Sequence, residues 1–282
     1  MVFINPKTDF AFKKIFGSKK HKTILISFLN AILYEEQAVI QDLEILNPYQ
    51  APRIKGIKDS FLDVKAVTSD HQTVIIEMQV LNILGFDKRI LYNAAKAYSI
   101  QLDIGEEYTL LNPVIALTIT DFEMFPEGKR LISRYVLKEK QDFTTYSDDI
   151  ELVFVELPKF KKDLAHLETL TDKWLYFLKQ ANKLTQVPET MAEIPAINQA
   201  FKVARQSKLT RREAEILEEQ ARVIHDQHNA LAFAERKGIE KGKEEGMREK
   251  TIAIARELLD VLDIETISRK TGLTVAEIRS LT

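Results

Sequence analysis

The sequence predicts an α/β domain followed by a mainly helical C-terminal region. Up to about residue 160, segments with the pattern of strands occur between segments with the apolar spacing of helices. After Pro158 almost every segment has helical spacing. The 282 residues include 45% hydrophobic and 29% charged side chains, a globular composition with enough apolar surface for one large core or two ordinary ones.

The first predicted elements are two helices and a strand. Residues 8–16 start with a Thr or Asp cap and end before Gly17, as a short helix does. Residues 24–33 repeat the helical pattern. Residues 39–46 alternate imperfectly, and we expect a strand there.

A β-hairpin is predicted next, from strands at 61–68 and 73–80. Each strand has an apolar face and a face that carries polar side chains, because successive residues of a strand point to opposite sides. The apolar faces are expected to contain Leu62, Val64 and Ala66 in the first strand, and Val74, Ile76, Met78 and Val80 in the second. The polar faces contain Asp63 and Lys65, and Glu77 and Gln79.

A helix at 87–104 with a breaker at Gly105 and a buried strand at 114–120 follow the hairpin. Two further strands are expected at 133–137 and 151–157. In the second half of the chain, the predicted helices cover residues 171–184, 190–206, 210–236 and 247–260.

Four regions are predicted from these patterns. Residues 1–160 form the α/β domain, residues 161–235 a helical region, residues 236–250 a charged linker or helix containing glycine, and residues 251–282 a small helical module. Within the last module, two short helices would join at Lys270-Thr271-Gly272, as in a helix-turn-helix. Only Arg279 of the second helix is suited to reading bases, so a packing or dimerisation module is the preferred interpretation.

Charge and composition exclude several classes of protein. The net charge of −2 gives no overall basic field for nucleic acid, so a DNA site must be local. The absence of cysteine excludes disulfides, thiolate metal sites and cysteine nucleophiles. There is no signal-peptide core and no apolar run of about 18 residues, so we expect a cytoplasmic protein without a membrane span. His225 and His228 lack an evident third ligand for zinc, and no P-loop, dinucleotide-binding fingerprint or serine-hydrolase elbow is present.

Asp63 and Glu77 are the candidate chemical residues of the hairpin. If they oppose each other across antiparallel strands, their Cβ atoms lie about 5 Å apart, which suits a shared divalent cation. That register leaves residues 69–71 as a three-residue loop, whereas a two-residue turn would place the carboxylates on opposite faces. The alternative is that both carboxylates belong to the solvent-facing side of an amphipathic hairpin.

Several segments together resemble a known family. An Asp on one strand followed by Glu-X-Lys or a similar motif on the next, in the order α-β-β-β-α-β, is the PD-(D/E)XK nuclease pattern. The segments that carry the closer resemblance are TDFAFKKIFG at 8–17, LDVKA at 62–66, IIEMQ at 75–79, the helix with Arg89, Tyr92 and Tyr98, and GEEYTLLNPVIALTITDF at 105–122. Over residues 5 to 160 the chain resembles the Rpn family of recombination-promoting nucleases and transposases.

The resemblance implies a restriction-endonuclease-like mixed sheet flanked by helices, and a metal-dependent DNA endonuclease. Asp63, Glu77 and the backbone carbonyl of Met78 would bind Mg²⁺, or Mn²⁺ in its place, and Gln79 would orient the attacking water. The superfamily usually has lysine where this chain has Gln79, which supplies hydrogen bonds but no charge. Lys65 could supply the missing charge, or it is a plain surface lysine.

Six further residues are weighed as contributors to this site. Asp9 would be an additional acidic residue, although its place at the start of a helix gives it a capping role as well. Lys13, Lys14 and Arg89 would bind DNA phosphates, or they are ordinary surface charges. Tyr92 and Tyr98 are more simply explained by packing against the sheet than by stacking on bases.

Three functional hypotheses remain. The leading one is a metal-dependent endonuclease that acts on DNA in a recombination or transposase-like role, expected as a homodimer because two sites can cut two strands. The second is a catalytically weak or inactive nuclease fold that binds DNA or proteins, which Gln79 in place of lysine favours. The third is a purely structural interaction protein, which the near-neutral charge favours.

Overall fold

A computed structural model describes residues 2–50 and 60–281 of the chain. The chain divides into two compact units, residues 1–224 and 225–282. Within the described residues, no helix has both the length and the hydropathy that crossing a bilayer requires.

The first unit is built on a mixed six-stranded sheet in the order β1-β4-β5-β6-β8-β7. Its strands are β1 (Leu43–Leu46), β4 (Val64–Thr68), β5 (Thr73–Gln79), β6 (Val114–Thr120), β7 (Ile132–Lys138) and β8 (Thr145–Glu156). The central strands β5, β6 and β8 are parallel, and the other neighbours are antiparallel. A separate two-stranded ribbon pairs β2 (Tyr49–Gln50) with β3 (Ser60–Phe61). The predicted α/β class is thus confirmed.

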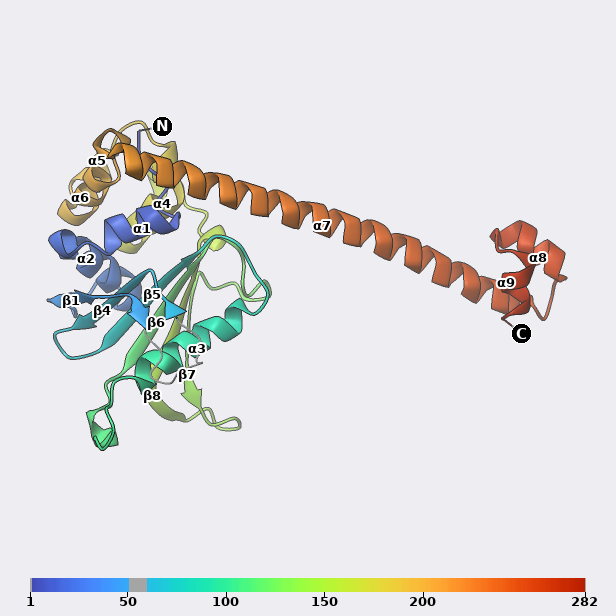
Figure 1. Ribbon diagram of the computed structural model, residues 1–282, viewed down its shortest axis with the longest axis horizontal. Helices are drawn as coiled ribbons and strands as arrows, with labels where there is room; N and C mark the ends of the chain where they lie inside the picture. Colours follow the sequence, from blue (N-terminus) through green and yellow to red (C-terminus); the bar gives the residue numbers. More distant parts are fainter. Residues whose placement is uncertain (1, 51–59, 282) are drawn as a thin grey trace. The chain divides into compact units, whose positions relative to one another are not determined.

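Helices cover both faces of the sheet (Figure 1). One face packs against α1 (Asp9–Phe16), α2 (Lys22–Leu33), α4 (Leu170–Gln180) and α6 (Pro195–Val203), and the short α5 (Glu189–Ala192) precedes α6. The other face packs against α3 (Phe86–Ser99), where Ala94 and Ala97 contact Ile75 of β5 and Ala116 of β6.

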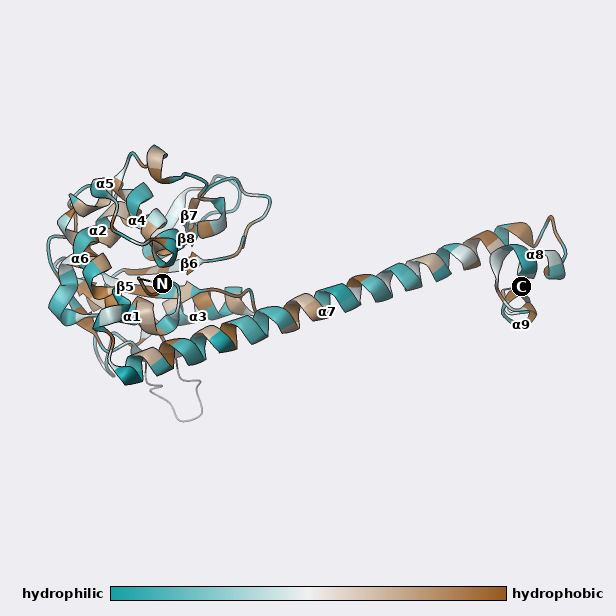
Figure 2. Ribbon diagram, turned by 90° about the horizontal axis from the view of Figure 1, so that it is seen from above, coloured by the Kyte–Doolittle hydropathy of each residue, from teal (hydrophilic) through white to brown (hydrophobic). Residues whose placement is uncertain are grey.

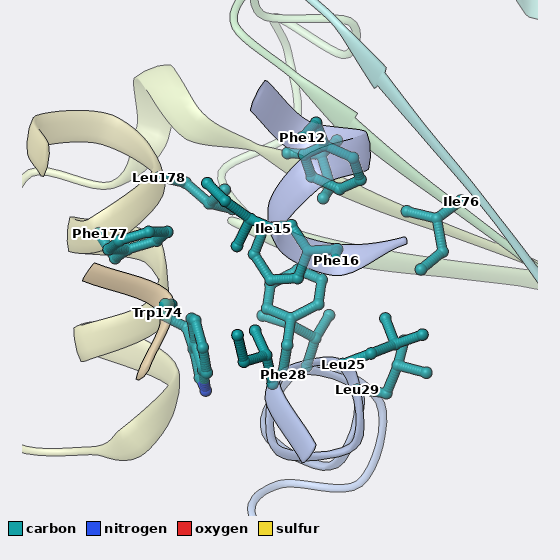
Figure 3. Packing of buried hydrophobic residues seen from close by; sticks show 14 of the residues in the cluster. Phe12, Ile15, Phe16, Leu25, Phe28, Leu29, Ile76, Trp174, Phe177 and Leu178 are labelled. Carbon is teal, nitrogen blue, oxygen red and sulfur yellow. The ribbon is translucent and has the colours of Figure 1, made fainter. Parts of the chain in front are cut away.

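Aromatic rings fill the core between α1, α2 and α4 (Figure 3). Phe16 lies 4.8 Å from Phe28 and 5.8 Å from Trp174, measured between ring centroids. Trp174 and Phe177 come after residue 160, yet they belong to the same buried cluster as the sheet. The helices that follow residue 160 therefore complete the core of the first unit, and the division expected near residue 160 does not coincide with a boundary between compact units.

Several predicted elements are shorter in the structure, including the first hairpin strand, which begins at Val64 and not at residue 61. The strand expected at 39–46 begins at Leu43, because the backbone N–H and carbonyl of Ile40 are both hydrogen-bonded to the Asn30 side chain, each at 2.8 Å. The helix expected at 87–104 ends at Ser99.

The helix α7 (Arg211–Leu258) is longer than predicted. It has 48 residues and includes residues 236–250, so the glycines there do not interrupt the helix. Most of its side chains are polar, as the hydropathy colouring in Figure 2 shows. It begins in the first unit and ends in the second.

The second unit contains two short helices after the end of α7. They are α8 (Ile264–Thr271) and α9 (Val275–Arg279), and Gly272 between them has a φ of +77°, which favours glycine. Thr274 caps α9 in a capping box with Glu277. Ala255, Ile267 and Ile278 form the small core of this unit. The pair of helices joined at Gly272 matches the sequence prediction.

Candidate active site

A cavity of about 740 Å³ opens beside the start of β4 and the end of β5. Helix α1, the segment from β3 to β4, strand β5, the loop after β5 and helix α3 all contribute to its wall. The residues that line it are Asp9, Lys13, Phe61, Asp63, Glu77, Met78, Gln79, Ile83, Leu84, Gly85, Phe86, Lys88, Arg89, Tyr92 and Asn93.

The hairpin register places Asp63 opposite Glu77. Val64 pairs with Ile76, and the Thr68 N–H donates to the Gln72 carbonyl at 3.0 Å, so the hairpin has the three-residue loop. His71 closes this loop with a φ of +66°, the left-handed conformation common at the end of such loops. The register that brings the two carboxylates to one face is therefore the one that forms.

Asp63 lies in a bend immediately before β4. Its backbone N–H donates to the Ile76 carbonyl at 3.2 Å, and its Oδ2 accepts from the Met78 N–H at 2.7 Å. The bend also corrects one prediction: Leu62 packs with Ile75 on the α3 side, whereas Val64 packs on the opposite face. The alternation of the strand is broken at Asp63, so Leu62 and Val64 do not share a face.

Glu77 is held from α3 by two side chains. Asn93 donates to Oε1 of Glu77, and the Nη2 atom of Arg89 lies 3.3 Å from Oε2. The side chain of Glu77 is 11% exposed and that of Asp63 is 14% exposed. The alternative that both carboxylates belong to a solvent-facing side of the hairpin is therefore wrong, because α1 and α3 cover them.

Burial makes both carboxylates hard to ionise. Loss of water, together with a hydrogen bond to Asp9, raises the pKa of Asp63 to about 7, although the Met78 N–H and Lys13 oppose the increase. Burial also raises the pKa of Glu77, against the opposing effects of Arg89 and Asn93. Buried carboxylates with perturbed pKa values in a cavity are typical of functional sites.

Helix α1 contributes one acidic residue, Asp9, and one basic residue, Lys13, to the same cavity. The Nζ atom of Lys13 lies 2.5 Å from Oδ1 of Asp9 and 3.5 Å from Oδ1 of Asp63. Burial alone would lower the pKa of Lys13, but the hydrogen bond and attraction to the two carboxylates outweigh it and raise that pKa. The structure thus brings Asp9 and Lys13 together with Asp63.

Other predicted residues lie elsewhere or are already engaged. Gln79 lines the cavity, but its Oε1 accepts from Arg89 at 2.8 Å and its Nε2 donates to the Leu81 carbonyl at 2.8 Å. Lys65 is paired across the strands with Ile75, and burial lowers its pKa. Lys14 forms an ion pair with Glu213 of α7. Neither lysine is among the described residues that line the cavity.

Two residues that hold acidic side chains of the site, Asn93 beside Glu77 and Gln220 beside Asp9, were not anticipated from the sequence. Asn93 follows Arg89 by one helical turn, and this i, i+4 spacing on α3 was the signal for a pair that faces β5. Gln220 of α7 accepts from the Phe10 N–H at 3.0 Å and its Nε2 lies 3.5 Å from Oδ2 of Asp9. Nothing in the local sequence connects Gln220 with a helix 210 residues earlier.

The donor set of the cavity fits a hard divalent cation. Such ions prefer carboxylate and carbonyl oxygens, and Asp63, Glu77 and Met78 offer both kinds on one wall. The two carboxylates are buried with raised pKa values, so a cation beside them would relieve the cost of ionising them. Among the described residues, no group of three or more His, Cys, Asp or Glu side chains is arranged to hold a metal ion, so a cation would need backbone or substrate oxygens to complete its shell.

A mixed sheet flanked by helices, with one acidic residue just before a strand and another near the end of the adjacent strand, is typical of the PD-(D/E)XK class of nuclease folds. The chain belongs to the PD-(D/E)XK nuclease family transposases, whose family model matches residues 6–234. The match confirms the superfamily that the sequence motifs indicated, and it extends well past residue 160 into α7. No curated protein and no solved structure matches the chain.

Proposed function

We propose that this chain is a DNA endonuclease that hydrolyses phosphodiester bonds with Mg²⁺, or Mn²⁺ in its place. One observation carries the proposal: Asp63, just before β4, and Glu77 of β5 lie in the wall of one cavity with side chains only 14% and 11% exposed, and the same cavity contains cationic side chains. The family supports a nuclease-like role. A homodimer would provide one site for each strand of the DNA.

Asp63, Glu77 and the Met78 carbonyl would hold the cation. A bound divalent cation lowers the pKa of a water molecule and stabilises negative charge on the phosphate. Asp63 keeps its hydrogen bond from the Met78 N–H, which fixes one oxygen and leaves the other facing Lys13. Asn93 orients Glu77 in the same way from α3.

Lys13 and Arg89 would change partners when DNA and cation bind. Each contacts one of the two buried carboxylates, and each lines the cavity. Once a cation neutralises the carboxylates, the lysine and the guanidinium group are left beside the place where a phosphate enters. We assign both residues to phosphate binding, and Arg89 is suited to bidentate contact. Asp9 holds Lys13 in place through their 2.5 Å contact.

A catalytically weak or inactive nuclease fold is the second candidate. The observation that favours it is Gln79, whose two side-chain atoms are both hydrogen-bonded to protein groups. In that arrangement the Gln79 amide has one N–H and one lone pair left for a water molecule, and it carries no charge that would lower the pKa of that water. Under this alternative the cavity binds DNA or a partner without cutting.

Cleavage of supercoiled plasmid tests the two candidates. The protein is assayed with Mg²⁺, Mn²⁺, Ca²⁺ or EDTA, alongside Asp63→Ala and Lys14→Ala, the latter a matched change outside the cavity. We expect cutting that requires Mg²⁺ or Mn²⁺, disappears in Asp63→Ala and persists in Lys14→Ala, with all three proteins melting cooperatively. DNA binding without cutting under any metal selects the second candidate.

A further inference from the structure

Large apolar side chains are exposed at the cavity that contains the carboxylates. Phe61, Ile83, Leu84 and Tyr92 line it, and all four are among the exposed large hydrophobic residues of the chain. Single exposed apolar residues are ordinary on protein surfaces, but several around one charged cavity mark a binding surface. We call these four residues the apolar rim.

The topology places the apolar rim next to the reacting groups. Strands β4 and β5 are antiparallel, so the start of β4 and the end of β5 lie at the same edge of the sheet. Phe61 comes two residues before Asp63, and Leu84 comes five residues after Gln79. Both segments therefore extend beyond the sheet from the edge that carries Asp63 and Glu77.

Local structure presents the apolar side chains instead of burying them. The ring of Phe61 lies 4.9 Å from that of Tyr49 across the β2–β3 ribbon, an arrangement that supports it from one side. Leu84 precedes Gly85, whose φ of +78° turns the chain sharply into α3. The Phe86 N–H donates to the Ile83 carbonyl at 3.1 Å and closes this turn.

Charges in the same cavity determine what can cover the apolar rim. Lys13, Lys88 and Arg89 line it together with three carboxylates. A purely apolar partner would bury all six charges, and the free energy of removing them from water is far larger than the free energy gained by burying the apolar rim. A divalent cation would make the cavity net positive and favour a polyanion. Nucleic acid with accessible bases combines negative phosphates with flat apolar faces, as this surface requires.

We propose that the apolar rim contacts unstacked bases, so that the site takes DNA with unpaired nucleotides in preference to continuous duplex. In duplex DNA the faces of the bases are covered by their neighbours, and exposing one costs a few kcal/mol. A single strand, a bubble or a flap presents these faces without that cost. The inference rests on the proposed function only for the position of the phosphate to be cut.

Binding of three fluorescent DNAs tests the proposal with the full-length protein. The probes are a single-stranded oligonucleotide, the blunt duplex of the same sequence and that duplex with a central unpaired bubble, each titrated with Ca²⁺ present. The test variant is Phe61→Ser with Leu84→Ser. The control variant is Phe143→Ser with Ile104→Ser, and neither of these residues lines the cavity. The exposures match: Phe143 is 68% exposed and Phe61 is 71% exposed, and Ile104 and Leu84 are both 106% exposed.

We expect the wild type and the control variant to bind the single strand and the bubble at least tenfold more tightly than the duplex. Loss of one stacking contact weakens binding on the order of tenfold, so the test variant should lose this preference and keep its affinity for duplex. Equal affinity of the wild type for all three DNAs overturns the inference, as does a test variant that binds like the wild type. A test variant that changes its sedimentation and not its DNA binding overturns it in favour of contact between copies of the chain.

The outcome separates this inference from the proposed function. If the wild type prefers unpaired DNA through the apolar rim but never cuts, the endonuclease proposal fails, and the proposal that the apolar rim contacts unstacked bases is retained. If the wild type cuts, and the test variant cuts single-stranded and duplex DNA in the wild-type ratio, the endonuclease proposal is retained. Only the proposal that the apolar rim contacts unstacked bases then fails.

Discussion

Replacement of Asp63 by asparagine should stabilise the protein at alkaline pH when no divalent cation is present. The pKa of Asp63 is raised from 3.8 to about 7 in the folded state, so folding favours its protonated form. Stability is therefore lost as pH rises from about 4 through 7, since the unfolded chain gives up the proton first. Asparagine resembles the protonated acid and can still accept a hydrogen bond from the Met78 N–H.

The size of the effect follows from the shift in pKa. At about 1.4 kcal/mol per unit, the ionised side chain costs up to about 4 kcal/mol at pH 8. Imperfect replacement of one hydrogen bond removes roughly 1 to 2 kcal/mol of the gain, so Asp63→Asn should be about 2 to 3 kcal/mol more stable than the wild type in EDTA. Near pH 4 the cost of ionising Asp63 falls below about 1 kcal/mol, so the weaker hydrogen bond outweighs it and the advantage of Asp63→Asn should disappear.

Urea unfolding followed by tryptophan fluorescence measures this difference. The chain has one tryptophan, and Trp174 is fully buried in the aromatic core of the first unit, so its fluorescence reports on that unit. Added Mn²⁺ should stabilise the wild type and leave the variant unchanged, because the variant has lost a ligand.

Asp172→Asn is the matched control. Burial alone would raise the pKa of Asp172, but Lys162 and backbone N–H groups outweigh it and lower the pKa, so this change should destabilise the protein by roughly 1 to 3 kcal/mol at pH 8. If Asp63→Asn is no more stable than the wild type at pH 8, or if its advantage does not shrink toward pH 4, burial does not raise the pKa of Asp63 as described.

Three further predictions concern other parts of the chain. Lys13→Ala should weaken DNA binding and cleavage by about tenfold or more, because Lys13 lies in the cavity beside Asp63. Lys14→Ala should change both less than threefold, because the Lys14 side chain pairs with Glu213 of α7. Equal effects of the two changes in a gel-shift titration would contradict the assignment of Lys13 to phosphate binding. Gln220→Ala should lower the metal affinity measured by calorimetry without unfolding the first unit, because it removes the hydrogen bonds from Gln220 to the first turn of α1. An unchanged affinity would show that α1 keeps its position without these hydrogen bonds. Gly272→Ala should destabilise the second unit by about 1 kcal/mol, because the φ of Gly272 is +77°. Gly238→Ala in the exposed part of α7 should instead raise the helicity measured by circular dichroism. Stabilisation of the second unit by Gly272→Ala would contradict the described turn.

Local patterns were sufficient to predict most elements of the first half. The apolar spacing of Phe12, Ile15 and Phe16 gave the first helix, and all three residues are buried. Alternation in the two hairpin strands allowed two registers, and the three-residue loop that opposes Asp63 and Glu77 is the one found. These features depend on neighbours in sequence, so the sequence pattern is enough to reveal them.

Features that depend on distant contacts could not be predicted. The bend at Asp63 moves Leu62 to the other face, because the carboxylate replaces a backbone partner for the Met78 N–H. The hydrogen bonds of Gln79 to Arg89 and Leu81 depend on how the next loop folds. No periodicity in either segment reports such contacts.

The contact of Gln220 with the first turn of α1 determines how the chain can be divided. A fragment that stops near residue 160 would retain Asp63 and Glu77 but would lose Trp174 and its neighbours from the core and Gln220 from Asp9. A fragment that stops just after residue 224 keeps all of these contacts, since the first compact unit ends there. Excision, fusion or exchange of the C-terminal part should therefore be made beyond this point within α7.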